Sequence, residues 1–231
     1  MMIHNQRQRI SRLRFIIGMI VLIFFIGGIA VFLVKKFKLE HIEVVGDGMK
    51  LEINERLLMG NTLFFPSESI RLQLLSTYPE LLDVVVQKKV PNTVVIIPTL
   101  RVPIAELITK TAAFIVDQDG VVIGPSHGVT LPQIAIDVPY IRLGGNIKDK
   151  KVIAALEFLK YSKDTVLVKT ITNPDGKTLL AKTEQLDVLF SEDNDREEVV
   201  RSLQLLLSGF RIKGTMPKVI DLRFTKLIVQ W

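Results

Sequence analysis

Apolar residues are unevenly distributed along this chain. The longest uninterrupted apolar stretch runs from Phe15 to Val34 and contains no charged residue and no proline. As a helix rising 1.5 Å per residue it measures about 30 Å, which matches the hydrocarbon core of a bilayer. A helix also satisfies its own backbone hydrogen bonds in lipid. The stretch therefore predicts one membrane-spanning helix over residues 15–34.

A secretory signal peptide is the alternative interpretation of this stretch. The apolar region of a signal peptide is shorter and ends at a small-x-small cleavage motif, which Ala30-Val31-Phe32 does not match. We therefore expect the helix to be retained. Four arginines precede the stretch and three lysines follow it, a small bias that places the N-terminus in the cytosol. We expect a cytoplasmic tail over residues 1–14, a single-pass type II orientation, and residues 35–231 outside.

The pattern after the span changes to short apolar and β-branched runs. Gly46-Asp47-Gly48 ends the first run, Pro79 ends a helical one, and Pro98 is expected to end a strand or mark a bulge, because proline cannot donate to a ladder. The expected order is strand, helix, helix, strand, strand. These elements cover Leu39–Val45, Leu51–Met59, a helix capped by Ser67 or Ser69, Val84–Lys89 and Thr93–Ile97.

From Ala105 onward the pattern is mostly that of β-strands, with two helices. Gly209 is expected to end the second of these helices, after an N-cap at Asp193, Asn194 or Asp195. The chain is predicted to finish in a hairpin that turns at Thr225-Lys226. The predicted fold class is α+β, with a mostly antiparallel β domain. Its expected elements are strands at 112–116, 121–123, 166–172, 178–182, 186–190, 219–224 and 227–231, and helices at 151–161 and from about 195.

Charge and composition narrow the classes of function. The net charge of +6 suits a nucleic-acid partner, but seven of the 30 Lys and Arg lie at or before Lys38, and the remaining 23 face 24 Asp and Glu. The excess of basic residues is therefore juxtamembrane. The rest of the chain has no excess positive charge with which to neutralise phosphates, so we expect no nucleic-acid binding. The chain has no cysteine, which excludes disulfides and thiol chemistry.

Two short motifs are candidate sites of chemistry. Ser126 and His127 are adjacent, and neighbouring side chains do not readily present a base to a nucleophile; no orienting acid or oxyanion hole is marked. Asp117-x-Asp119-Gly120 lacks the third oxygen ligand and the distal glutamate of a calcium loop, and a plain turn is favoured. We expect no enzymatic activity, no cofactor, no metal and no small-molecule substrate.

The C-terminal strand is the candidate interaction site. An edge strand exposes unpaired N–H and C=O groups that can pair with another chain, and edges are usually protected by charge, proline or a covering loop. Leu227-Ile228-Val229 has no such protection beyond Lys226. Addition of a partner strand is one interpretation. The other is an interior strand on which Trp231 simply packs.

Several motifs, in this order and spacing, resemble those of the bacterial cell-division family FtsQ/DivIB, which has one span followed by a polypeptide-transport-associated (POTRA) domain. The motifs are Ile42-Glu43-Val44-Val45-Gly46, Asn61-Thr62-Leu63-Phe64, Tyr78-Pro79, Val90-Pro91-Asn92-Thr93, Arg101-Val102-Pro103-Ile104-Ala105, Leu131-Pro132-Gln133-Ile134 and the terminal Ile220-Asp221-Leu222-Arg223-Phe224 with Trp231.

The resemblance implies a POTRA domain over residues 35–104, in the order β-α-α-β-β, and an FtsQ/DivIB-type β domain over residues 105–231. It implies a non-enzymatic scaffold at the division septum, in the bacterial inner membrane, that binds FtsB/DivIC-like and FtsL-like single-span proteins. The implied partner-binding residues are Arg223, Phe224, Leu227, Ile228, Val229, Gln230 and Trp231. Two other functions stay open: a POTRA-bearing component of protein transport, and a membrane-anchored cell-wall hydrolase.

Overall fold

The computed structural model describes residues 3–46, 60–128, 130–224 and 228–230. The chain folds into two compact units. The first comprises Met1–Leu74 and Asp83–Thr99, and the second comprises Leu75–Leu82 and Leu100–Trp231.

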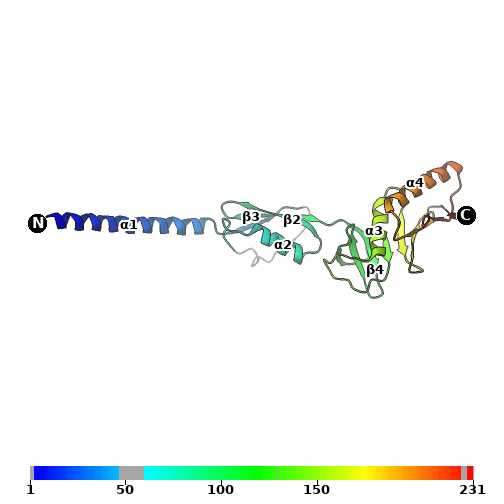
Figure 1. The fold of residues 1–231 in the computed structure, drawn as a ribbon, viewed down its shortest axis with the longest axis horizontal. Helices are drawn as coiled ribbons and strands as arrows, with labels where there is room; N and C mark the ends of the chain where they lie inside the picture. Colours follow the sequence, from blue (N-terminus) through cyan, green and yellow to red (C-terminus); the bar gives the residue numbers. More distant parts are fainter. Residues whose placement is uncertain (1–2, 47–59, 129, 225–227, 231) are drawn as a thin grey trace. The chain divides into compact units, whose positions relative to one another are not determined.

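The first unit begins with the long helix α1 (Ile3–Lys36), which is labelled in Figure 1. Its segment Ile17–Lys36 has a mean hydropathy of 3.0 and none of its side chains is buried, so it is long and apolar enough to cross a membrane. Among the described residues it is the one helix that meets this description. The apolar N-terminal helix expected from the sequence is thus present, and it is consistent with single-pass anchoring.

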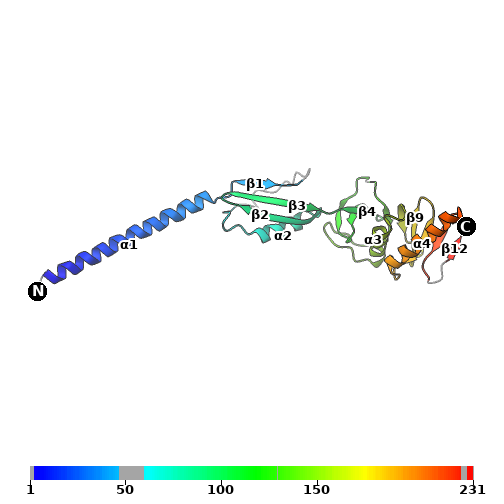
Figure 2. The ribbon, with the colours of Figure 1, turned by 90° about the horizontal axis from the view of Figure 1, so that it is seen from above.

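A small sheet follows α1, in the order β1-β3-β2, and α2 lies alongside it in both views (Figures 1 and 2). Strand β1 pairs in parallel with β3, with His41 opposite Thr93 and Val44 opposite Ile96. Helix α2 buries Ile70 and Leu74 on one side. The bounds are β1 His41–Val44, α2 Ser67–Thr77, β2 Leu81–Lys89 and β3 Thr93–Leu100.

Pro98 lies inside strand β3 rather than at its end. The strand continues through Pro98 to Leu100, so the expectation that Pro98 ends the strand was wrong, while the alternative that it marks a bulge stays a prediction. The pairing of β1 with β3 ends at Ile96, and proline is tolerated where no ladder bond from its nitrogen is required. The expected helix Leu51–Met59 lies outside the described residues. The POTRA arrangement therefore stays a prediction.

The second unit is built on one large mixed sheet. The described strands lie in the order β12-β11-β10-β9-β8-β7-β4-β5-β6. Three neighbouring pairs are parallel (β4 with β7, β7 with β8, β10 with β11) and the other five are antiparallel. The bounds are β4 Pro103–Ile108, β5 Ala113–Asp117, β6 Val122–Pro125, β7 Gln133–Ala135, β8 Val168–Thr172, β9 Thr178–Thr183, β10 Asp187–Ser191, β11 Val219–Asp221 and β12 Ile228–Gln230.

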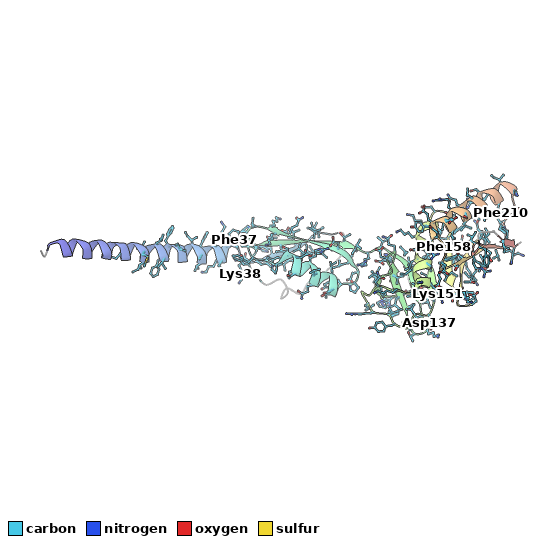
Figure 3. All side chains as sticks on the ribbon, viewed as in Figure 1. Phe37, Lys38, Asp137, Lys151, Phe158 and Phe210 are labelled. Carbon is cyan, nitrogen blue, oxygen red and sulfur yellow. The ribbon has the colours of Figure 1, made fainter. Side chains whose placement is uncertain are left out.

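Two helices connect the parallel strands and cover the core. Helix α3 (Lys150–Ser162) joins β7 to β8, and α4 (Arg196–Lys213) joins β10 to β11, as parallel neighbours require. Their apolar faces close over the sheet, where the rings of Phe158 and Phe190 stack 4.5 Å apart. Figure 3 labels Phe158 inside this packed region and Phe210 on α4.

The ends of α4 follow from its capping residues. Asp195, one of the three expected N-caps, accepts hydrogen bonds from the backbone N–H groups of Glu197 and Glu198. The helix passes through Gly209 and ends at Gly214, so the expected end at Gly209 was wrong. Gly214 has a positive φ of 71° and caps the helix in the left-handed conformation, which glycine adopts without strain. Phe210, packed against the core one residue after Gly209, favours this continuation.

Candidate functional site

Strand β12 lies at one end of the large sheet (Figure 2). In the described part of the chain its single neighbour is β11, to which it pairs in antiparallel register, with Ile220 opposite Val229. Among the described residues this segment is therefore an end strand, and not the interior strand of the alternative interpretation. The side chain of Ile228 is 46% exposed on this edge. One side of β12 is thus available for pairing with another chain.

Five of the seven predicted partner-binding residues are described: Arg223, Phe224, Ile228, Val229 and Gln230. Leu227, Trp231 and the expected turn Thr225-Lys226 lie outside the described residues.

The side chain of Arg223 is held by hydrogen bonds to two other residues of the chain. Its guanidinium donates to both carboxylate oxygens of Asp221, with Nη2 to Oδ2 at 2.6 Å and Nε to Oδ1 at 3.0 Å. Its Nη1 donates to Oγ1 of Thr178 at 3.0 Å, and that hydroxyl donates to Oδ2 of Asp175 at 2.7 Å. The network ties the end of β11 to the start of β9, two strands away. Arg223 therefore positions the segment that precedes β12.

These contacts shift the pKa values of the carboxyl groups. The hydrogen bond from Arg223 lowers the pKa of Asp221 and raises that of Arg223 itself. Hydrogen bonds from the Thr178 side chain and backbone lower the pKa of Asp175 from 3.8 to about 2. Both aspartates are thus charged at neutral pH, and the ionised forms are the ones that the fold favours.

We expect this network to fail in acid. A carboxyl group whose pKa is lower in the folded than in the unfolded state stabilises the fold above its unfolded pKa, and that contribution is lost as the pH falls through its folded pKa. For Asp175 the window runs from its ordinary 3.8 down to about 2. In thermal melts of the full chain in detergent, the melting temperature should fall less between pH 5 and pH 2 for Asp175→Asn than for the unchanged chain. The exposed Asp164→Asn is the control; an Asp175→Asn melt with an unchanged pH slope would contradict the assignment.

A small cavity of about 170 Å³ lies beside this segment. Phe224, 57% exposed, forms one wall, and its ring lies 5.3 Å from the guanidinium of Arg223. The remaining lining residues come from the start of α4 and from the end of β11: Asn194, Asp195, Glu198, Val199, Ser202 and Leu222. Among the predicted partner-binding residues that the structure describes, Phe224 is the one that lines this hollow, so the hollow adjoins the segment before β12 and not β12 itself.

Asp117 has a structural role that the sequence did not reveal. Its Oδ2 accepts a 2.7 Å hydrogen bond from Nη1 of Arg101, and its Oδ1 accepts from the backbone N–H groups of Asp119 and Val121. The two charged side chains are only 17% (Arg101) and 3% (Asp117) exposed. The pair borders an apolar cleft of about 590 Å³ within the second unit, whose walls include Ile104, Leu159 and Val166. The carboxylate is thus occupied in fixing the turn between β5 and β6.

Ser126 and His127 lie in the segment after β6. The hydroxyl of Ser126 is buried and has no hydrogen-bond partner among the described residues, while His127 is exposed. A serine nucleophile needs a base within hydrogen-bond reach. The described geometry gives no support to the hydrolase alternative.

Comparison with known proteins does not assign a family. No family model matches the chain, and no curated protein matches it. Function is therefore inferred from the chain itself.

Proposed function

We propose that this chain is a bitopic, non-enzymatic scaffold of the bacterial cell-division machinery, similar to the FtsQ/DivIB family. The N-terminal helix anchors it in the inner membrane with the N-terminus in the cytosol. The rest of the chain, a POTRA domain over residues 35–104 and a β domain over residues 105–231, lies outside and recruits partners at the septum.

The observation that supports this proposal best is the open edge of β12 in a chain that also has a helix able to cross a membrane. An edge strand binds a partner through main-chain hydrogen bonds, and alternate side chains along the strand add specificity. Ile228 and Phe224 are both exposed there. The partners are FtsB/DivIC-like and FtsL-like single-span proteins, which bind through Phe224 and residues 227–231.

Affinity capture tests the proposal. The tagged full chain, extracted from membranes in mild detergent, should co-purify with small single-span proteins that contain coiled-coil segments, identified by mass spectrometry. A control chain that ends at Arg223, and so keeps Leu222 and the Arg223 network but lacks both Phe224 and β12, should lose them. Capture of outer-membrane or secretion components in their place would support a transport function instead and would contradict the proposal.

A further inference from the structure

Two loops of the first unit lie against the C-terminal end of α1. One is the segment 60–64, which is hydrogen-bonded to the last turn of α1: Nδ2 of Asn61 donates to the Val34 carbonyl at 3.1 Å, and the backbone N–H of Thr62 donates to the Phe37 carbonyl at 2.8 Å. These bonds satisfy carbonyl groups that a helix end leaves without partners. The segment 60–64 is therefore fixed beside the point where the candidate span ends.

The turn at residues 90–92 lies at the same place. The hydroxyl of Thr62 donates to the carbonyl of Pro91. The carbonyl of Asn92 accepts from the backbone N–H groups of Glu40 at 2.9 Å and His41 at 3.2 Å. Figure 3 labels Phe37 and Lys38 at this junction. The two loops together form one surface, here called the base, beside the C-terminal end of α1.

The base exposes large apolar side chains. Phe64 is 81% exposed and Val90 is 63% exposed, with Leu63 at 43%. The neighbouring Phe65 is 3% exposed, so the segment does bury one aromatic ring while presenting the other. Exposed apolar clusters of this kind mark surfaces that bind another apolar phase.

Basic residues surround these apolar side chains. Lys35, Lys36 and Lys38 lie at the end of α1, and Nζ of Lys36 lies 5.7 Å from the ring of Phe32. The ammonium of Lys88 lies 3.5 Å from the carbonyl of Leu63. Two acidic groups among the described residues at this end have partners: a carboxylate oxygen of Glu43 lies 3.1 Å from Nζ of Lys89, and Glu40 accepts from the side chain of Asn92. The base therefore presents positive charge next to exposed hydrocarbon.

We propose that the base rests in the headgroup layer of an anionic bilayer, with Phe64 and Val90 at the boundary with the acyl chains and Lys36, Lys38 and Lys88 on the phosphates. This inference rests on the membrane anchoring in the proposed function. It follows from continuity, because the base is hydrogen-bonded to the end of a helix that crosses the membrane. Apolar side chains with flanking lysines are the combination that binds an interface. The contact orients the first unit on the membrane surface.

Because the chain has no cysteine, a single introduced cysteine can be spin-labelled selectively to measure its depth in the membrane. Val90→Cys and Thr99→Cys each introduce one site for a nitroxide label in the full chain, reconstituted into vesicles of phosphatidylcholine and phosphatidylglycerol. Thr99 is exposed and lies six residues along β3 from Thr93, about 20 Å farther from the base. We expect the label at Val90 to be accessible to oxygen and shielded from a water-soluble nickel complex, and the label at Thr99 to show the opposite.

The charge requirement has a matched pair of variants. In the Val90→Cys chain, Lys88→Gln should raise the nickel accessibility of the label by about twofold. The double change Lys89→Gln with Glu43→Gln should not, because it removes both members of an ion pair and leaves the net charge of the base unaltered. Vesicles of phosphatidylcholine alone should reproduce the effect of Lys88→Gln without any change to the protein.

The possible outcomes separate the two proposals. A chain that fails to float with the vesicles after an alkaline wash overturns both the anchoring and the inference. An anchored chain whose Val90 label is as accessible to nickel as the Thr99 label overturns the inference alone. Shielding of Val90 that appears only after a membrane protein extract is added shows that the base binds protein, which also overturns it.

Discussion

The substitution Ile228→Pro is expected to weaken capture of the single-span partners by about fivefold to a hundredfold, since an unmade main-chain hydrogen bond costs about 1–3 kcal/mol and about 1.4 kcal/mol corresponds to tenfold. Proline removes the backbone N–H and fixes φ, which disrupts the edge strand where a partner strand would pair. Successive N–H groups along a strand point to opposite sides, so the N–H group of either Ile228 or Val229 faces away from β11. Val229→Pro is therefore tested alongside Ile228→Pro. The measurement is co-purification from detergent-solubilised membranes, quantified against the unchanged chain.

The matched control lies at the opposite edge of the same sheet. Ile123→Pro places the same substitution in β6, where the register shifts between the pairs Ile115–Gly124 and Val116–Val122 and where proline is therefore tolerated. Circular dichroism should show that all three variants keep the fold. Equal capture by Ile228→Pro, Val229→Pro and the unchanged chain would exclude β12 as the binding edge.

The second large effect is on stability, at Asp117. Replacement by alanine leaves the guanidinium of Arg101 without its carboxylate partner and removes the acceptor for the N–H groups of Asp119 and Val121. Removing one member of a buried ion pair costs about 3–5 kcal/mol, because the remaining charge is left uncompensated. We expect Asp117→Ala to lower the free energy of unfolding of the second unit by this amount.

Urea unfolding of the full chain in detergent, followed by circular dichroism, measures this loss. Asp119→Ala is the control, since Asp119 lies in the same turn with an exposed side chain. Its cost should stay below about 0.5 kcal/mol, as for ordinary surface substitutions. A loss of less than about 1 kcal/mol for Asp117→Ala would contradict the role assigned to the pair.

Features that depend on neighbouring residues could be read from the sequence. The apolar stretch 15–34 indicated the helix that α1 contains, and Asp195 was among the expected N-caps because its side chain bonds only two and three residues ahead. The end of α4 was misplaced because Gly209 and Gly214 both fit a C-cap. The choice between them depends on the packing of Phe210 against the core, and this packing cannot be read from the residues next to Phe210 in the sequence.

Features that depend on the order of strands could not be read. The crossover helices α3 and α4 were expected as helices, but nothing local indicated that they join parallel neighbours. For the same reason the sequence left the position of β12 open, and the sheet order decided it. The ion pair of Arg101 with Asp117 and the exposed base around Phe64 and Val90 each join segments well separated in sequence. The contact of Arg223 with Asp221, by contrast, joins residues two apart in the sequence and is of the local kind that a sequence can suggest.

Site-specific photocrosslinking in growing bacteria tests most directly whether the chain binds a membrane partner on the edge of β12. A photoreactive phenylalanine analogue at position 228 should form a covalent adduct with a small single-span protein, and the same analogue at position 123 on the opposite edge should not. An adduct at position 123 with none at position 228, or no adduct at either, would contradict the account.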